Sequence, residues 1–304
     1  MMPLLQSSSA RCRILAVLVV ACAALADAAP LTVATYNVEN YTLADRMTDD
    51  GYRTEYPKSE ASKQALRAVI RAIDADVLVL QEMGPSPYLR ELQRDLRAEG
   101  LDYTFADQVE AADPVRQLAV LSKIAPKAVG RHGMLMFPFN GRDERVKRGT
   151  LELVFGTPSG DVTLWVVHLK SRFTEEPGDP AAAQRRAGEA VAVRDLVLSR
   201  YAEPEAARFA ILGDCNDTKT SRPLRALQER GELRFTELLP ALDSRGESWT
   251  HHFAKADSYD RVDYVLVSPA LKPLVRGAAA RIVDLPEVRQ ASDHRPVVFV
   301  LELP

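Results

Sequence analysis

The chain has 304 residues, of which 46% are hydrophobic and 27% charged, and its formal net charge at pH 7 is −3. This composition is typical of a globular protein with enough apolar residues for a large core. The small negative charge argues against a protein that clamps DNA through a global excess of basic residues, although it is compatible with a local basic patch.

Residues 1–28 predict a secretory signal peptide. Arg11 and Arg13 precede an apolar run of about a dozen residues, which is too short to be a stable transmembrane helix. Ala26 and Ala28 then form an Ala-x-Ala cleavage pattern, so we expect cleavage after Ala28 and one mature domain of residues 29–304. We therefore expect a secreted or periplasmic protein, with no transmembrane segment after processing.

The cysteines fit this interpretation. Cys12 and Cys22 lie in the leader, so Cys215 is the cysteine that remains, and a lone cysteine cannot form an internal disulfide. We expect the mature protein to be stabilised by its core. Residues 19–22 also resemble a bacterial lipoprotein signal, and the alternative is therefore a protein that is lipid-anchored at Cys22.

Apolar, β-branched runs that adjoin polar or ionisable clusters recur along the chain, and such runs predict buried strands. In chain order they are 31–40 with Asn37, 76–82 with Glu82, 162–172 with His168, Lys170 and Arg172, 209–217 with Asp214, Asn216 and Asp217, 261–268 with Asp263, and 293–303, in which Asp293 and His294 precede the apolar run.

Amphipathic and polar segments separate these runs. The expected helices are residues 59–75, 87–99 and 180–200, with a short helix at 223–230, and the expected loops are 41–58, 107–117, 138–148 and 173–180. Some strands follow one another directly and others are separated by helices. This order predicts a mixed sheet system with helices outside.

The polar clusters together supply carboxylates and amides, which suit a hard cation, and two imidazoles. Taken singly, an acid at the end of a strand is usually a solvated cap or an ion-pair partner. Strand ends can also bring such groups to one edge of a sheet, where the active sites of open α/β folds lie. The set therefore predicts an active site.

Six segments carry a resemblance to a known family: T-Y-N-V-E-N, L-Q-E, H-L-K-S-R, L-G-D-C-N-D, V-D-Y-V-L and S-D-H-R-P. They occur in the order found in the endonuclease/exonuclease/phosphatase (deoxyribonuclease I-like) superfamily. From about residue 31 to residue 302 the chain resembles secreted bacterial members of this group. The resemblance implies a four-layered α/β sandwich, with two mixed β-sheets packed face to face and helices outside, and metal-dependent phosphoester hydrolysis.

The resemblance also implies a metal site. Glu82 is expected to be the principal ligand, and Asn37 and Asp293 complete the site directly or through water. Mg²⁺ is the expected ion, with Mn²⁺ or Ca²⁺ as alternatives, because Mg²⁺ prefers oxygen ligands and keeps several waters. The ion offsets the negative charge that develops on the phosphoryl group.

For catalysis, the resemblance implies roles for His168, Asp214, Asp263 and His294. Asp263 is expected to fix the tautomer of His294 through a carboxylate–imidazole hydrogen bond. Either Asp214 or His294 can be the base, and the sequence leaves both open. His168 is expected to contact phosphate or to protonate the leaving group.

Further side chains are expected to bind the substrate phosphate. Asn216 is an amide donor suited to a phosphate oxygen, and Arg148, Lys170 and Arg172 offer cations. Lys170 and Arg172 follow His168 by two and four residues, so alternation along a strand predicts that they lie on one face. The alternative for the three cations is a solvated surface. Cys215 is interpreted as core packing.

The remaining candidates are weaker. The histidines that match no family segment are expected to be structural or surface residues: His132, His251 and His252. The stretch 134–139 (M-L-M-F-P-F) is interpreted as an edge strand or core, with a membrane-binding hairpin as the alternative. The tyrosine and arginine that grip DNA in repair-type nucleases have no clear counterpart in this region.

We therefore expect a secreted, divalent-metal-dependent phosphodiesterase, namely a nuclease that hydrolyses extracellular DNA or RNA as a monomer. The alternative is a phosphatase or phospholipase-type enzyme that acts on inositol phosphates, sphingomyelin or another small phosphoester. A catalytically dead binding relative is disfavoured, because no acid or histidine of the constellation is missing.

Overall fold

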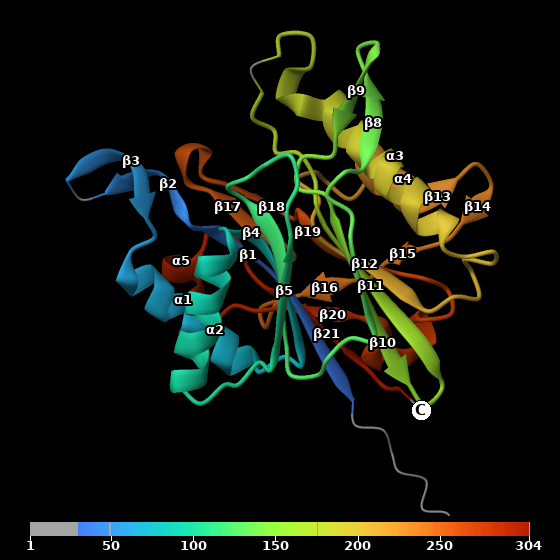
Figure 1. Ribbon diagram of the computed structural model, residues 1–304, viewed down its shortest axis with the longest axis horizontal. Helices are drawn as coiled ribbons and strands as arrows, with labels where there is room; N and C mark the ends of the chain where they lie inside the picture. The colour runs from blue at the N-terminus through green and yellow to red at the C-terminus, as the bar shows by residue number, and fades with distance from the viewer. Residues whose placement is uncertain (1–29, 49, 175, 304) are drawn as a thin grey trace, which may run out of the picture.

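A computed structural model describes residues 30–48, 50–174 and 176–303 (Figure 1). The predicted signal peptide and the Cys22 alternative lie outside these residues. Within the described part, no helix has both the length and the apolar character needed to cross a membrane.

Two mixed β-sheets form the centre of the molecule. The first has seven strands in the order β16 (Ala241–Leu242), β20 (Ala280–Ile282), β21 (Val297–Leu301), β1 (Leu31–Tyr41), β4 (Val77–Met83), β6 (Gln117–Ser122) and β5 (Phe105–Val109). The second has six, in the order β15 (Glu237–Leu238), β19 (Asp263–Val267), β12 (Phe209–Asp214), β11 (Gly160–His168), β10 (Thr150–Thr157) and β7 (Ala128–Arg131).

The main core lies between the two sheets. Val33 and Val79 of the first sheet and Leu164 and Leu212 of the second belong to one buried cluster. Successive residues of a strand point to opposite faces, so the alternate side chains pack outward against helices. Burial of each such side chain contributes about 1.5–3 kcal/mol before the entropy cost of folding.

The helices form the two outer layers (Figure 1). The first sheet is covered by α1 (Glu60–Ile73), α2 (Ser86–Ala98) and α5 (Val288–Ala291), and the second by α3 (Ala183–Ser199) and α4 (Arg222–Ala226). The predicted four-layered sandwich is therefore confirmed.

Helix α1 shows how local sequence fixes an element. The Ser59 side chain accepts a hydrogen bond from the Ser62 backbone N–H and caps the first turn. The predicted apolar stripe, including Leu66 and Ile70, is fully buried. Asp74 adopts a left-handed conformation with φ of 50° and ends the helix.

Two expected loops are instead hairpins. Residues 41–58 contain β2 (Leu43–Thr48) paired with β3 (Gly51–Pro57), and residues 138–148 contain β9 (Arg142–Arg145) and the second half of its partner β8 (Met136–Phe139). These strands are largely exposed, so they lack the apolar alternation that marks a strand in a sequence. The short helix expected at 223–230 ends at Ala226, and β13 (Glu229–Arg230) pairs with β14 (Leu233–Arg234).

The stretch 134–139 is divided between core and surface. Phe137 and Phe139 are buried beside Ala192 of α3, which agrees with the edge-strand or core interpretation. Met134 and Met136 are exposed. The apolar content of this stretch therefore serves mainly to attach the β8–β9 hairpin to α3.

Arg295, the arginine of the S-D-H-R-P segment, has a structural role. Its Nη2 donates to Asp243 Oδ2 at 2.6 Å, and its guanidinium lies 4.0 Å from the centre of the Trp249 ring. Both members of the ion pair are buried. Burial opposes the charge of Asp243, but Arg295 and two backbone N–H donors hold the pKa of this carboxyl well below its usual range.

We predict that Asp243→Ala lowers the free energy of unfolding by about 3–5 kcal/mol, because it leaves a buried guanidinium without its partner. Urea denaturation at pH 7 measures this change. Asp161→Ala is the control, since the Lys127–Asp161 pair is exposed and is expected to contribute no more than about 1 kcal/mol. Equal effects of the two variants would contradict the prediction.

The pH dependence has a definite sign. The lowered pKa means that the Asp243 carboxylate stabilises the protein above the unfolded-state pKa of about 4. This contribution is lost as the pH falls below that value.

Candidate active site

Strand register aligns three predicted residues in one row across the second sheet. His168 ends β11 and pairs with Asp214 at the end of the parallel strand β12, and Asp214 pairs with Asp263 at the start of the antiparallel strand β19. Gly213 permits the close approach of β11 and β12, because a Cβ atom there would lie 2.0 Å from Val167 O, and its φ is 138°.

The first sheet supplies residues to the same end of the molecule. Asn37 in β1 donates from Nδ2 to Asp214 Oδ2 at 3.0 Å, which connects the two sheets. Glu82 in β4 lies 4.0 Å from His168 Nε2 through its Oε1 atom. His294, just before β21, lies 3.8 Å from Asp214 Oδ2 through its Nε2 atom.

His294 is held as predicted. Its Nδ1 lies 2.8 Å from Asp263 Oδ2, so the carboxylate accepts the Nδ1–H and fixes the imidazole orientation. Nε2 then faces Asp214 and a cavity beside His294, which is called the catalytic cavity below. Although burial alone opposes its positive charge, Asp263 and Asp214 raise the pKa of His294 well above its usual range.

Burial also separates the acid–base properties of the neighbouring groups. Desolvation, reinforced by Asp263, raises the pKa of Asp214 to about 7. Desolvation and the nearby Arg148 guanidinium lower the pKa of His168 well below its usual range. Groups with opposite shifts in one site are typical of acid–base catalysis.

The cavity beside His294 has a volume of about 620 Å³ and is lined by Glu82, Asp214, Asn216, Asp293 and His294, among others. Asn216 donates from Nδ2 to Leu169 O and to Asp214 Oδ2, so both of its amide hydrogens have acceptors in this structure.

The predicted metal ligands fit a hard cation. Glu82 and Asp293 direct carboxylates to the same cavity and supply the oxygen donors that Mg²⁺ prefers. Glu82 has a φ of 62°, a strained conformation for a non-glycine residue that is enriched at functional sites. Asn37 is buried, and its Oδ1 accepts the Glu39 N–H at 3.0 Å.

Asp214, Asp263 and His294 form a buried cluster whose candidate ligand atoms all lie within 4.8 Å of one another. The donor types in the site as a whole, carboxylate oxygens and imidazole nitrogens, suit divalent cations. The cluster thus places two carboxylates and an imidazole, which are suitable both for metal binding and for acid–base chemistry, within reach of one another.

The predicted cations lie on two sides of the site. Arg172 lines the catalytic cavity and lies 3.3 Å from Asp260. Arg148 and Lys170 line an adjoining cavity of about 700 Å³. Burial and the neighbouring Arg148 lower the pKa of Lys170 to about 8. Lys170 and Arg172 therefore do not act on one face, as alternation along an extended strand suggested.

Arg148 is the most constrained of these cations. It is buried, its Nε lies 3.3 Å from Asp113 Oδ2, and neither its Nε nor its Nη1 has a hydrogen-bond partner among the described residues. A buried donor without a partner is costly. This arrangement favours an anionic ligand in the adjoining cavity.

A single carboxylate positions the chain around the adjoining cavity. Glu189 of α3 is buried, and its two oxygens accept the backbone N–H groups of Lys147 at 2.8 Å and Lys170 at 2.6 Å. The backbone on both sides of the cavity is therefore tied to one helix. The side chains of Lys147 and Lys170 take no part in these two bonds.

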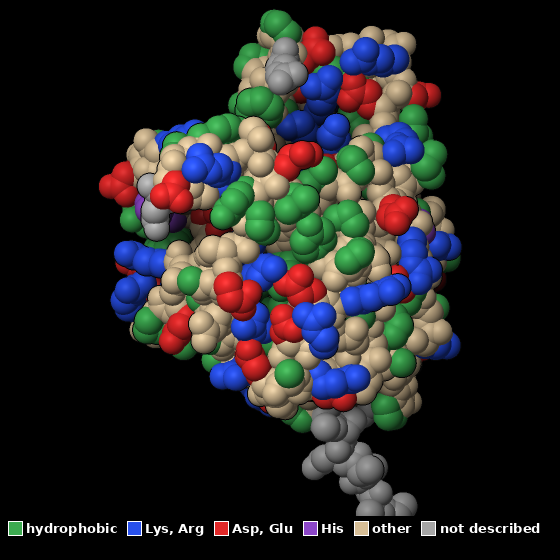
Figure 2. Space-filling view, turned by 60° about the vertical axis from the view of Figure 1, so that its left-hand side comes forward, with side chains coloured by type: hydrophobic (Ala, Val, Ile, Leu, Met, Phe, Trp, Pro, Cys, Tyr) green, Lys and Arg blue, Asp and Glu red, His purple; other side chains and the backbone are tan. Residues whose placement is uncertain are grey.

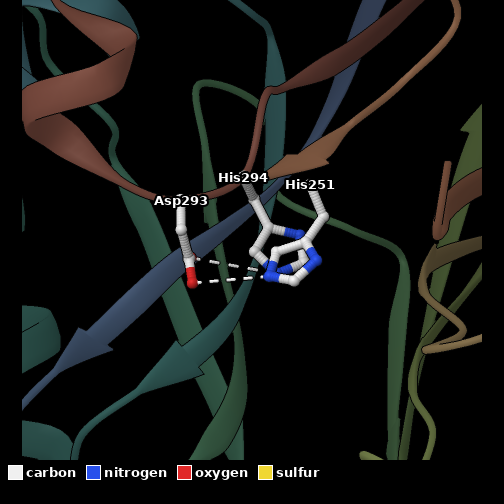
Figure 3. Close-up of side chains that lie close together, drawn as sticks. All are labelled: His251, Asp293 and His294. Carbon is white, nitrogen blue, oxygen red and sulfur yellow. Dashed lines mark ion pairs between the residues drawn. The ribbon is translucent and has the colours of Figure 1, made fainter. Parts of the chain in front are cut away.

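His251 is a site residue that the sequence analysis missed. It begins β17 (His251–Phe253), lines the catalytic cavity, and lies 4.6 Å from His294 between ring centres (Figure 3). The structure therefore places His251 inside the candidate site, which the sequence analysis did not anticipate. Its segment, T-H-H-F, matches no family motif, so the sequence held no signal for this contact.

Cys215 behaves as expected. It is fully buried among the side chains between the second sheet and its helices. Burial raises the pKa of its thiol well above the usual range, which disfavours the thiolate that a nucleophile requires.

Comparisons with known proteins agree with this arrangement. The sequence pattern of the Endonuclease/Exonuclease/phosphatase family matches residues 34–294. A comparison with curated proteins found no match.

Solved structures share the fold. A beta-toxin mutant from Staphylococcus aureus with bound magnesium ions is 16% identical, covers 89% of this chain and 99% of its own, and superposes with a TM-score of 0.62. Sphingomyelinase C from Streptomyces griseocarneus is 16% identical over 90% of this chain and 100% of its own, with a TM-score of 0.57. A family protein from Leptotrichia buccalis is 14% identical over 89% and 99%, with a TM-score of 0.60.

The family's pattern spans most of the chain, from the first buried strand to His294. The protein therefore belongs to the endonuclease/exonuclease/phosphatase family of metal-dependent phosphoester hydrolases.

Proposed function

We propose that this protein is a secreted, Mg²⁺-dependent nuclease that hydrolyses phosphodiester bonds in extracellular DNA or RNA, acting as a monomer. The choice of nucleic acid as the substrate rests on the adjoining cavity. This cavity opens beside Glu82 and is lined by five basic side chains: Arg116, Lys147, Arg148, Lys170 and Arg185. Secretion rests on the leader predicted from residues 1–28.

The charges in this cavity favour a polyanion. Three acids also line it, Glu82, Asp113 and Glu176, so the basic side chains are in excess. Among the described residues, neither Lys147 nor Lys170 has a carboxylate partner within ion-pair distance. Figure 2 shows Lys and Arg side chains in a recess near the top of the molecule. A nucleic acid carries phosphates on both sides of the bond that is cleaved, and such a surface would bind them.

The residues of the catalytic cavity suggest the chemistry. Glu82 and Asp293, with Asn37 beside them, would hold the cation, which supplies Lewis-acid stabilisation of the negative charge on the phosphoryl group. His294 Nε2 and Asp214 Oδ2 lie 3.8 Å apart, so an attacking water placed between them could give its proton to either group. Asp263 keeps the Nε2 atom of His294 directed at this point.

His168 is best suited to hydrogen bonding. Its lowered pKa keeps the imidazole neutral near pH 7, so it can donate one hydrogen bond to a phosphate oxygen without carrying a charge. A neutral imidazole does not hold the second proton that a leaving-group acid needs.

A second candidate function is hydrolysis of a phospholipid headgroup such as that of sphingomyelin. The β2–β3 hairpin exposes Leu43, Met47, Tyr52 and Tyr56, and exposed apolar groups on a projecting hairpin suit a membrane surface. The fold is also that of sphingomyelinase C. The basic cavity disfavours this candidate, because it would repel a cationic choline group.

The test of function uses the purified mature protein. It is incubated with plasmid DNA, RNA, a panel of phosphomonoesters, and sphingomyelin vesicles, each with Mg²⁺ and with chelator. Cleavage of nucleic acid that chelator abolishes is the expected result. Intact nucleic acid with hydrolysis of sphingomyelin or a small phosphoester would overturn the nuclease proposal while keeping the phosphoesterase chemistry.

We predict that His294→Ala lowers kcat by about three orders of magnitude or more and leaves the fold intact, since it removes only transition-state stabilisation. Steady-state kinetics and circular dichroism check both parts. His252→Ala is the matched control, because His252 is the next residue of β17 after His251 and pairs with Asp257 outside the cavity. A His294→Ala enzyme with near-normal kcat would remove His294 from the mechanism.

We predict that Glu82→Gln weakens Mg²⁺ binding at least about tenfold, because an amide oxygen carries no charge for a hard cation. Calorimetric titration of Mg²⁺ into the protein measures affinity independently of turnover. Glu176→Gln, at the edge of the adjoining cavity, serves as the control. Unchanged Mg²⁺ affinity in Glu82→Gln would place the metal elsewhere.

We predict that Lys147→Ala raises KM for a polynucleotide but not for a small phosphodiester, because the lysine would contact a phosphate away from the cleaved bond. The slope of log KM against log salt concentration is expected to fall by about 1. Lys127→Ala is the control, since Lys127 is exposed and pairs with Asp161 away from the cavity. Equal changes in KM for both substrates would argue against an extended polyanion site.

A further inference from the structure

His251, Asp293 and His294 form a compact cluster at the wall of the catalytic cavity (Figure 3). His251 Nε2 lies 3.5 Å from Asp293 Oδ2, and His294 Nε2 lies 4.0 Å from Asp293 Oδ1. One candidate ligand atom from each residue lies within 4.8 Å of the other two. Zinc bonds of about 2.0–2.1 Å in a tetrahedral site separate ligand atoms by about 3.3–3.4 Å. The three ligand atoms would therefore need to move only slightly toward one another to bind one ion.

Backbone pairing places the two histidines side by side. His251 and His294 form an antiparallel β-bridge, and the His252 N–H donates to Asp293 O at 3.0 Å. The Arg295 N–H donates to Thr250 O at 2.7 Å on the other side of the bridge. Ligands carried on paired backbone are held more precisely than ligands on a free loop.

The cluster also has the supporting contact that histidine ligands require. Asp263 accepts the Nδ1–H of His294, which directs Nε2 toward the cavity and raises the basicity of that nitrogen, and a bound metal ion would take the place of the Nε2 proton. Metal-binding histidines almost always carry such a partner on the second ring nitrogen.

We propose that His251, Asp293 and His294 bind a transition-metal ion of the zinc class, at a site that shares Asp293 with the Mg²⁺ site at Glu82 and lies on the histidine side of it. Two imidazole nitrogens and one carboxylate oxygen suit Zn²⁺, whereas Mg²⁺ prefers oxygen ligands. The three residues line the cavity, and the Asp293 side chain is 41% exposed, so an ion can reach the site from solvent and would keep a position open toward the cavity.

Occupation of this site inhibits the enzyme, a consequence that rests on the proposed function. Coordination uses the Nε2 lone pair of His294, so His294 can no longer accept a proton from water. It also engages Asp293, which is expected to assist in binding Mg²⁺. The Mg²⁺-dependent rate therefore falls when a zinc-class ion binds, even though Mg²⁺ is present.

Binding is tested without reference to activity. Zn²⁺ is titrated calorimetrically into the full mature chain in excess Mg²⁺, and Co²⁺ is used as a spectroscopic probe of coordination by nitrogen ligands. The expected result is one Zn²⁺ per chain and a visible Co²⁺ spectrum typical of four-coordinate geometry. His251→Gln is expected to weaken Zn²⁺ binding at least about tenfold. His252→Gln, the adjacent histidine outside the cluster, is expected to bind Zn²⁺ like the wild type.

Inhibition is measured with the phosphodiester substrate, relative to the rate of each variant in Mg²⁺ alone. The Zn²⁺ concentration that halves this rate is expected to rise at least about tenfold in His251→Gln and to be unchanged in His252→Gln. Absence of Zn²⁺ binding, or equal binding by wild type and a folded His251→Gln variant, overturns the proposal. If His251→Gln does not fold, an octahedral Co²⁺ spectrum of the wild type overturns it instead.

These outcomes are separate from the test of the proposed function. If the protein binds Zn²⁺ through His251 but does not cleave nucleic acid, the metal-site proposal stands and the nuclease proposal fails. If the protein cleaves nucleic acid but His251→Gln leaves its Zn²⁺ affinity unchanged, the nuclease proposal stands and the metal-site proposal fails.

Discussion

The hydrogen bond from Asn37 to Asp214 connects the two sheets at the end where their shared core stops. Asp214 is buried and also lies within ion-pair distance of both His168 and His294. Because these groups meet on one carboxylate, the packing of the sheets and the geometry of the site depend on each other. A shift of one sheet against the other would move Asn37 away from Asp214 and remove one hydrogen-bond donor from a buried carboxyl, which is costly in a low-dielectric interior.

The burial of Asp214 and His294 also shifts the pKa values of both groups. In water Asp214 and His294 would titrate near their ordinary values, and neither would respond strongly to the other. Between the sheets, desolvation raises the pKa of the carboxyl while the neighbouring acids raise the pKa of the imidazole. The Arg295–Asp243 pair preserves this burial, because it anchors the residue that follows His294 in a buried position.

Sequence patterns predicted the buried strands and a mixed sheet system with helices outside, because buried strands have a strong apolar signal. The four layers and the roles of the strand-end residues were implied by the family resemblance. The patterns did not predict the β2–β3 hairpin, whose exposed strands show no apolar alternation. They also missed His251. Its contact with His294 depends on backbone pairing between segments about forty residues apart, and no local pattern records such a pairing. Lys170 does not share a face with Arg172, contrary to the prediction. The reason is that β11 ends at His168, so the alternation of side chains along a strand no longer applies beyond it.

Glu189 fixes the main chain at Lys147 and Lys170 through their backbone N–H groups. Any amino acid except proline presents the same N–H, so this support does not depend on which side chains occupy the two positions. Mutations there can therefore alter the charge of the adjoining cavity without disturbing His168, which precedes Lys170 by two residues. The architecture allows ligand preference to diverge during evolution while the hydrolytic machinery is inherited unchanged.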